Sequence, residues 1–400
     1  MKFLSSLTAV LLLQSASTYA AQTTPTLQPG LSIEELRFSE AEQAMPVISD
    51  YYHWRSFEQQ WLKQDNYASA RQLVAALGDD LWQFSKRQNQ QGGLKDDRPL
   101  YWTRLAITAF LKQNPLDISL HENKALVEQL EVSSRGQDDL AFTQQTEKRI
   151  LLTGFDPFLL DKNISQSNPS GLTALMLDGK VIEYKGVKAE INTVMIPVRF
   201  EDFDQGEIED LLAPFYALGS VDMIATISMG RSDFDLEHFP ALRRSSSAPD
   251  NLNVYNGGSK TMPVVPKLLK TELSNKEFVQ YSLPYQAMMK AKGPYKINDN
   301  RTITVLGQAV DGKALSEEDN KTFAANSLKE LSDSVSVEGG GGGYLSNEIS
   351  YRSILLRNKL GSNIPTGHIH TPKTQGFDHQ TNQAIVDQIK AMLELSLAEI

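Results

Sequence analysis

The chain has 400 residues, with 40% hydrophobic and 22% charged residues, a formal net charge of −10 and no cysteine. This composition is typical of a globular protein of one large or two medium domains and excludes a disordered chain. The acidic balance argues against binding to nucleic acid or to anionic membranes, and the lack of cysteine excludes thiol catalysis, disulfides and cysteine–metal sites.

The amino end has the pattern of a signal peptide. Lys2 precedes a short apolar run over residues 3–13, and Thr18-Tyr19-Ala20 ends in small residues. We expect cleavage after about Ala20, giving an exported protein that is periplasmic or secreted. Lys2 is the only charge in residues 1–20, so cleavage changes the net charge from −10 to −11. The apolar run is too short to span a membrane and no later stretch approaches 18 apolar residues, so we expect no membrane insertion.

Residues 21–31 are rich in Thr and Pro and predict an extended leader. Residues 32–148 predict a helical N-terminal domain, because their apolar residues recur at helical spacing. The clearest sets are Phe57 and Trp61; Leu73, Leu77, Leu81 and Phe84; and Trp102, Leu105, Ala106 and Ala109. We interpret the aromatic stripes as core rather than as a ligand cage. The region contains no chemical motif, so its role stays open.

Residues 149–400 predict an α/β domain. Buried strands are expected at 150–153, 189–197 and 221–228, the last one central, with a helix at 207–218. This alternation is typical of a three-layer α/β/α arrangement. A polar insertion at about 293–333 carries one expected strand, 302–306. A strand-like stretch at 362–369 and an amphipathic helix at 382–397, capped by Asn382, close the chain.

A run of five glycines, 339–343, leads to Ser346. A helix beginning at Ser346 and continuing through 347–357 would direct free N–H groups and the positive end of its dipole at this point. Such a place suits a nucleophile and an oxyanion. The alternative interpretation is a flexible glycine hinge with Ser346 as the N-cap residue.

A histidine is needed to activate Ser346, because a serine hydroxyl is inert without a base. His368, His370 and His379 lie close together near the end of the chain. His-x-His on a strand places both rings on one face, so a metal pair is an alternative, but no third ligand is evident. We favour a base for Ser346 and expect no cofactor or metal.

Several short motifs then occur in one order over roughly 150–375. They are Gly154-Phe155-Asp156-Pro157-Phe158, Asn168-Pro169-Ser170, Gly230-Arg231 followed by Glu237, Pro249-Asp250-Asn251, Ser282-Leu283-Pro284 with Ala287-Met288, Tyr344-Leu345-Ser346-Asn347, and Gly367-His368-Ile369-His370-Thr371-Pro372. In order and in most spacings they resemble the pyrrolidone-carboxylate peptidases (pyroglutamyl peptidase type I). Each motif alone is weak, whereas the ordered set is specific; residues 1–148 lie outside the resemblance.

The resemblance implies an α/β/α sandwich and a peptidase that removes N-terminal pyroglutamate through a Cys-His-Glu triad. By motif, the triad falls on Ser346 as nucleophile, His370 as general base and Glu237 as the group that orients the imidazole. The flat lactam ring would be clamped by aromatic and apolar side chains and contacted by one amide. The corresponding residues here are Phe155, Phe158, Tyr344, Leu345 and Asn168.

The sequence departs from the family pattern at several positions. The family's cysteine is Ser346, and its arginine before Pro-Asp-Asn falls on Ser247, with Arg243 and Arg244 displaced. The run 227–230 is one residue shorter and lacks the family's glutamine. Glu348 stands where histidine is usual, and four residues are inserted between Phe158 and Asn168.

Two functions follow from these observations. The first is an exported, serine-type hydrolase acting on a peptide or small amide. The alternative is a weak or inactive pseudoenzyme that binds peptide N-termini in the cell envelope and uses the helical domain to dock a partner. The sequence leaves a homo-oligomer open.

Overall fold

The computed structural model describes residues 30–308 and 314–400. The expected signal peptide and most of the expected leader therefore lie outside the described residues. Within the described ranges, no helix is both long and apolar enough to cross a membrane.

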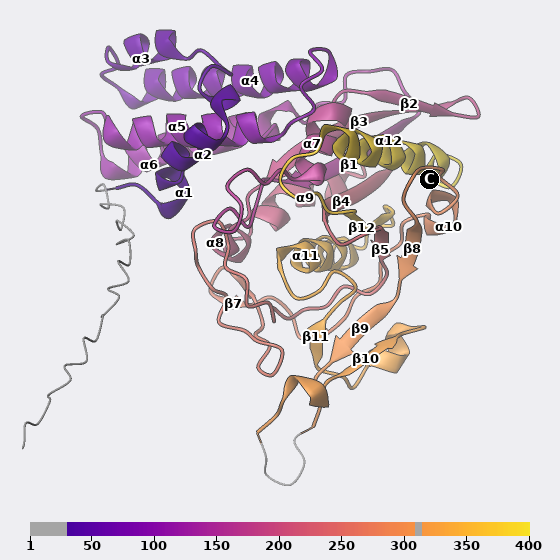
Figure 1. Cartoon of the computed structure of the whole chain (residues 1–400). Coiled ribbons are helices and arrows are strands. Elements are labelled where there is room, and N and C mark those ends of the chain that lie inside the picture. Colours follow the sequence, from indigo (N-terminus) through magenta and orange to yellow (C-terminus); the bar gives the residue numbers. More distant parts are fainter. Residues whose placement is uncertain (1–29, 309–313) are drawn as a thin grey trace, which may run out of the picture.

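The region before residue 140 is helical, which confirms the periodicity of the sequence (Figure 1). Its elements are α1 Ile33–Leu36, α2 Phe38–Ala44, η1 Pro46–Ile48, α3 Arg55–Trp61, α4 Tyr67–Gln90, α5 Arg98–Gln113, α6 Leu120–Ser134 and η2 Gln137–Asp139. Trp61, Leu81 and Trp102 are almost completely buried, so the aromatic stripes are core as expected. This core continues into the rest of the molecule, because Ala174 and Leu175 belong to the same cluster.

A seven-stranded sheet organises the rest of the chain, with strand order β2-β3-β1-β4-β12-β5-β8. The strands are β1 Lys148–Phe155, β2 Val181–Tyr184, β3 Val187–Ile196, β4 Met223–Met229, β5 Phe234–Glu237, β8 Ile297–Asn300 and β12 Thr366–Thr371. The core strands β3, β1, β4 and β12 are parallel. At the two sides, β2 runs antiparallel to β3, and β5 runs antiparallel to β12. The strand predicted to be central is β4, which lies in the middle.

Helices cover both faces of this sheet. They are α7 Pro169–Leu177, α8 Phe200–Asp204, α9 Glu207–Leu218, α10 Tyr285–Met288, α11 Leu345–Lys359 and α12 His379–Ser396. Side chains alternate along β1: Ile150 and Leu152 join the core with α7 and α12, whereas Leu151 joins the core with α8, α9 and the start of α11. Figure 1 shows α12 and α11 on opposite sides of the strands. The predicted α/β/α sandwich with an added helical region is confirmed.

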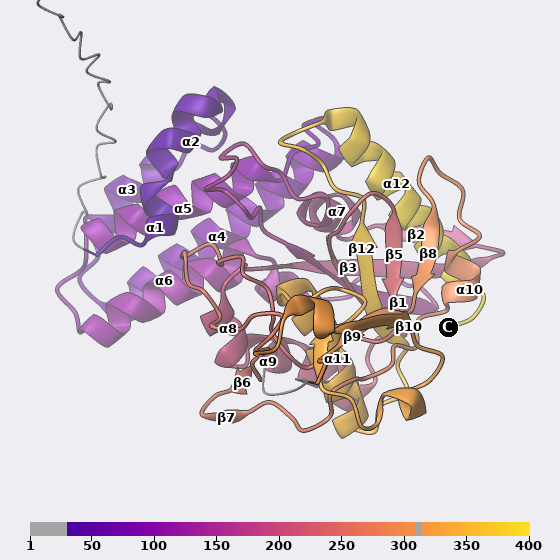
Figure 2. The ribbon, with the colours of Figure 1, turned by 60° about the horizontal axis from the view of Figure 1, so that its bottom comes forward.

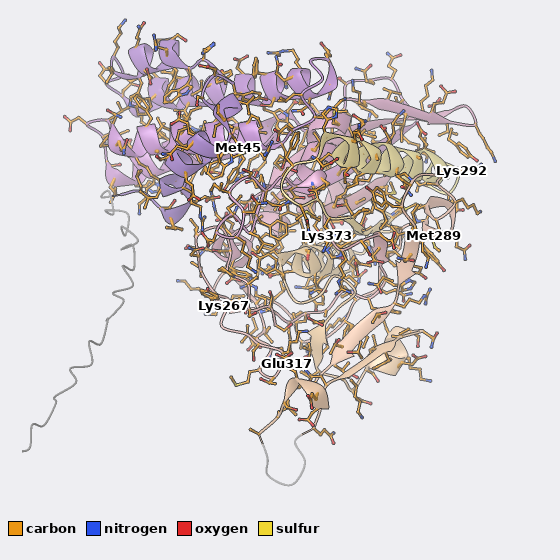
Figure 3. All side chains as sticks on the ribbon, viewed as in Figure 1. Met45, Lys267, Met289, Lys292, Glu317 and Lys373 are labelled. Atoms are coloured by element: carbon orange, nitrogen blue, oxygen red, sulfur yellow. The ribbon has the colours of Figure 1, made fainter. Side chains whose placement is uncertain are left out.

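The expected insertion at 293–333 contains β8 and two strands of a small outlying sheet of order β10-β9-β11, whose third strand lies just beyond residue 333. The elements of this region are β9 Thr302–Val305, η3 Glu317–Asp319, β10 Lys321–Ala324, η4 Leu328–Leu331 and β11 Ser336–Glu338. A separate hairpin, β6 Lys267–Leu268 and β7 Thr271–Glu272, precedes them in the chain. Figures 1 and 3 show this sheet projecting from the body, and Figure 3 shows Glu317 far from Met45 of the helical region; in Figure 2 the sheet lies in front of the body.

Three element ends differ from their predicted positions. The last helix begins at His379 because the Asp378 carboxylate accepts the Thr381 N–H, while Asn382 lies buried inside the helix and donates to Ser167 Oγ. The strand expected at 362–369 is β12, Thr366–Thr371. The helix after the glycines begins at Leu345 with Tyr344 at the N-cap, so Ser346 is not the cap residue.

Buried charge pairs join the helical region to the sheet. Arg135 Nη1 lies 2.6 Å from the Asp156 carboxylate, and Arg104 Nη1 lies 3.1 Å from it. All three side chains are almost completely buried. Asp156 follows β1 between Phe155 and Phe158, so the helical region holds the loop that carries both rings.

Candidate active site

A cavity of about 260 Å³ opens where β1, β4 and β12 end. The carboxyl ends of parallel strands are the usual place for ligands in such sheets. All but one of the residues predicted for the site line this cavity: Phe155, Phe158, Asn168, Tyr344, Leu345, Ser346 and His370. The exception, Glu237, lies directly behind His370.

His370 and Glu237 form a hydrogen-bonded pair. The His370 Nδ1 atom lies 2.6 Å from Glu237 Oε1. Glu237 is fully buried at the end of β5, and burial raises its pKa above the ordinary value, while the attraction of His370 opposes that rise. The carboxylate on Nδ1 leaves Nε2 as the nitrogen able to accept a proton from the cavity side, which is the arrangement of a general base.

The glycine run forms a tight turn that approaches Glu237, and is not a free hinge. Gly339 and Gly342 exchange two backbone hydrogen bonds of 3.0 Å, and Gly342 has a φ of +83°. A Cβ atom on Gly340 would lie 2.0 Å from Glu237 Oε2. Gly340 is therefore required for the carboxylate to stay behind the imidazole, and Gly342 for the turn.

Ser346 is the second residue of α11 and does not complete a hydrogen-bonded triad. Its Oγ donates to the carbonyl oxygen of Gly341 at 3.2 Å. Within the described residues, no hydrogen bond joins Ser346 to His370. Both side chains face one cavity, and the first-turn N–H groups of α11 lie at the same point. A rotation about the Ser346 side chain is thus needed before His370 could take its proton.

The aromatic wall of the cavity differs in part from the prediction. Phe158 stacks on Tyr344 with ring centroids 6.3 Å apart, and the Tyr344 hydroxyl donates to Pro249 O. Phe155 is 3% exposed and stacks on Phe203 in the core, so little of its ring reaches the cavity. The two phenylalanines therefore do not form a symmetrical clamp.

Asn168 also has a more structural role than the sequence predicted. Its amide donates to Asp156 O, and its side-chain oxygen caps α7 by accepting from Ser170 N. Both polar groups of Asn168 are thereby engaged within the protein, which argues against a primary role in polar contact with a ligand.

The arginines near the expected arginine position do not line the cavity. Arg244 pairs with Glu348 and Asp204, and Arg243 pairs with Glu277. Glu348 also pairs with Arg352, and these cations hold the pKa of Glu348 below its ordinary value despite its burial. Glu348 thus belongs to a buried ionic network under α11 and not to the catalytic group.

Sequence reasoning missed four polar residues of the cavity: Ser228, Arg231, Asp235 and Ser246. Asp235 accepts a hydrogen bond from Asn298, and its charge together with burial raises the pKa of Glu237, whereas the charge of Arg231 lowers it. Arg231 falls in a quoted motif and Ser228 in the shortened run, so their places in the sequence offered a signal. Asp235 is distinguished only by its place two residues before Glu237.

The metal alternative for the histidine pair does not fit the structure. His368 is fully buried, and its two ring nitrogens lie 2.7 Å from the hydroxyls of Thr226 and Ser228. It therefore has no nitrogen left for a metal. Elsewhere in the described ranges, no group of three or more His, Asp or Glu side chains could hold an ion.

The comparisons with known proteins match this architecture. The profile of the PA0049 C-terminal domain matches residues 149–282 and 308–375, about half of the chain, and that of the PA0049 N-terminal domain matches residues 15–131. The fold and the cavity define an α/β protein with a candidate active site at the carboxyl ends of its central strands. The chain belongs to the PA0049 family.

An uncharacterized protein, PA0049 from Pseudomonas aeruginosa, is 29% identical over 397 residues, which span 78% of this chain and 71% of that protein. Among solved structures, a mutant pyrrolidone carboxyl peptidase from the hyperthermophile Pyrococcus furiosus aligns at 19% identity and a TM-score of 0.41, covering 63% of this chain and 99% of that one. A structure of the same peptidase and its cysteine-free mutant gives the same values.

Proposed function

We propose that this protein is an exported hydrolase that releases N-terminal pyroglutamate, or a closely related cyclic acyl group, from a peptide or small amide. The observation that carries the proposal is the placement of His370 and Ser346 on one cavity, with Glu237 hydrogen-bonded behind the imidazole. A base, its orienting carboxylate and a hydroxyl at a helix start are the parts that acyl transfer requires.

The reaction follows from these parts. His370 Nε2 takes the Ser346 proton as Oγ attacks the scissile carbonyl, and Glu237 stabilises the imidazolium that forms. The N–H groups at the start of α11 bind the oxyanion. The C–N bond then breaks, the leaving amine takes the proton from His370, and an ester to Ser346 remains. Water, deprotonated by His370, cleaves this ester and releases the acid.

The walls of the cavity favour a small, uncharged, flat acyl group. Phe158, Tyr344 and Leu345 provide an apolar surface beside the α11 start. A lactam ring buries its faces on such a wall while its amide retains hydrogen-bonding groups at the edge. Arg231 and Asp235 lie at the same cavity and suit the polar part of the substrate beyond the ring.

One observation favours the second function, a pseudoenzyme that binds N-terminal peptide ends. The Ser346 hydroxyl donates to Gly341 O, and not to a base. A site shaped for a thiolate–imidazolium pair is poorly suited to oxygen, because a serine does not ionise at a helix terminus. A binding role requires the cavity and its walls but not the rotation of Ser346.

A serine-directed phosphonate probe and a fluorogenic pyroglutamyl amide distinguish the two functions. The hydrolase should be labelled at Ser346 and release the fluorophore, and both signals should disappear in Ser346→Ala and His370→Ala. His379→Ala, which alters an exposed histidine on α12, is the matched control and should keep both. If the protein binds the pyroglutamyl amide but is not labelled and releases no fluorophore, the pseudoenzyme would be established.

Export is a separate part of the proposal. The pattern of residues 1–20 supports it, and the intact mass of protein recovered from the periplasm or medium tests it. We expect the mature chain to start near residue 21. Recovery of the full chain from the cytosol alone would reject export and leave the proposed reaction untouched.

A further inference from the structure

A second histidine with two hydroxyl partners lies beside the proposed catalytic pair. Strands β4 and β12 are parallel neighbours, with Thr226 opposite His368 and Ser228 opposite His370. The His368 ring touches both hydroxyls, with Nδ1 2.7 Å from Thr226 Oγ1 and Nε2 2.7 Å from Ser228 Oγ. All three side chains are buried, yet Ser228 lines the cavity.

The direction of each hydrogen bond follows from one backbone carbonyl. Thr226 Oγ1 also lies 3.3 Å from Gly367 O, which can only accept. With the threonine proton on Gly367 O, the Thr226 oxygen accepts the Nδ1–H of His368. Nε2 is then unprotonated and accepts the hydroxyl proton of Ser228. Ser228 has one proton, and this arrangement commits it to the protein interior.

His368 is not a second catalytic base. Complete burial, and then the nearby His370, lower its pKa well below the ordinary value. Its orienting partner is the neutral Thr226 hydroxyl, whereas His370 has the Glu237 carboxylate. An imidazolium at His368 would have no counter-charge, so proton transfer belongs to His370. His368 instead fixes which way the Ser228 hydroxyl points.

We infer that Ser228 is a specificity-determining residue whose oxygen accepts a hydrogen bond from an N–H of the bound ring. This assignment rests on the proposed function, because it names the ring as a cyclic amide. A hydroxyl that can rotate serves as donor or acceptor, but Ser228, with its proton committed to His368, presents only lone pairs to the cavity. Ring N–H groups satisfy it, whereas a ring of the same shape without one leaves it unpaired.

Binding of two small rings to the Ser346→Ala protein tests this role without any turnover. 2-Pyrrolidone keeps the lactam N–H, and cyclopentanone replaces it by CH₂ while keeping the ring and the carbonyl. We expect ligand-observed NMR titrations to show about tenfold tighter binding of 2-pyrrolidone, the size of a neutral hydrogen bond. Adding Ser228→Ala should remove this preference. Adding Thr226→Val should reduce it, because the Nδ1–H tautomer of His368 is then no longer fixed by the Thr226 hydroxyl.

Ser396→Ala is the matched control, because Ser396 is also fully buried and donates to a backbone carbonyl, but on α12 and away from the cavity. It should keep the full preference, and circular dichroism should show that every variant is folded. Equal binding of the two rings when Ser228 is intact, binding of neither, or a preference that survives Ser228→Ala would overturn the assignment.

The failures of the two proposals remain distinguishable. A wild-type protein that prefers 2-pyrrolidone but releases no product would reject the hydrolase and keep the acceptor role. A protein that releases product but binds both rings equally would reject only the acceptor role. The phosphonate probe adds a further outcome: labelling of Ser228 instead of Ser346 would make Ser228 the nucleophile and overturn its assignment as a fixed acceptor.

Discussion

The His370 Nδ1 atom lies 2.6 Å from Glu237 Oε1, at a point where β12 and β5 run side by side in opposite directions. Among the described residues, this fully buried carboxylate has no partner as close as the imidazole, since its other oxygen accepts a hydrogen bond only from Asn300, at 3.4 Å. The Glu237 carboxylate and the His370 imidazole therefore stabilise each other, so removing the charge of Glu237 should impair His370.

Glu237→Gln should lower turnover of a pyroglutamyl amide by about a thousandfold, because the amide neither fixes the tautomer of His370 nor stabilises its imidazolium. The size of the side chain is unchanged, so the melting temperature should change little. Initial rates with the fluorogenic amide measure the effect. Glu183→Gln, an exposed change on β2, is the control, and equal rates for both variants would refute the role of Glu237.

Gly340→Ala should reduce turnover about as strongly as Glu237→Gln. The new methyl group would lie 2.0 Å from Glu237 Oε2 and must displace the carboxylate. Gly179→Ala provides the control: Gly179 has a positive φ, unlike Gly340, but has open space around its Cβ position. That control should lose about 1 kcal/mol of stability from backbone strain and keep its activity. An active Gly340→Ala protein would contradict the account of the glycine run.

Ser346→Cys should increase turnover by about tenfold or more, because the α11 start and the His370–Glu237 pair stabilise a thiolate and leave less proton transfer to the transition state. The thiol should react with iodoacetamide faster than free cysteine at neutral pH. Ser332→Cys, at an exposed position directly after η4, serves as the reactivity control. A thiol at 346 that reacts no faster than the control would show that the cavity does not activate a nucleophile.

The helical region should be required for the stability of the cavity loop. Asp156→Asn leaves Arg104 and Arg135 buried with one fewer counter-charge and should cost about 3–5 kcal/mol in the free energy of unfolding. Urea denaturation measures this loss. Asp161→Asn is the milder comparison, because the Asp161 side chain is 47% exposed where it meets Arg37. Equal losses for the two variants would show that the Asp156 pairs do not join the regions.

Stability should fall as the pH rises toward neutrality because of a cluster between α6 and α9. Burial, and then repulsion from Asp202, raise the pKa of Glu207 to about 7 from an ordinary 4.5, and burial raises that of Asp202 to about 6. Arg135 and Arg199 oppose both rises, and Glu131 reinforces them. A carboxyl with a raised pKa binds its proton more tightly in the folded state, so folding weakens across pH 4.5 to about 7.

Glu207→Gln should flatten this slope and raise the free energy of unfolding at pH 8 by about 1–2 kcal/mol. Urea denaturation at a series of pH values measures the slope, with Glu399→Gln as an exposed control. A steeper decline with pH in Glu207→Gln than in the wild type would mean that the sign of the shift is wrong.

Much of the fold was predictable from hydrophobic pattern alone. The helix predicted at 207–218 is α9, Glu207–Leu218, and the buried runs became β1, β3 and β4, because strong periodicity reflects burial directly. Element ends were less predictable, since they depend on single caps. Asp378 outcompeted Asn382 because Asn382 has a tertiary partner, Ser167, that no local pattern indicates.

The motifs made the positions of the site residues predictable, whereas the orientations of their side chains were less predictable. The resemblance placed Ser346, His370 and Phe158 at one cavity, but it could not show that Ser346 donates to Gly341 or that Phe155 turns into the core. Ser228 was overlooked because its significance arises from the pairing of β4 with β12, which brings it to His368 from 140 residues away.

The most direct test of the central claim is the intact mass of the protein after mixing with an activated pyroglutamyl ester, with the adduct located by peptide mapping. We predict a mass increase of one pyroglutamyl group on Ser346, absent in Ser346→Ala and strongly reduced in Glu237→Gln. Hydrolysis of the ester without any adduct on Ser346, or an adduct on another residue that persists in Ser346→Ala, would contradict the account.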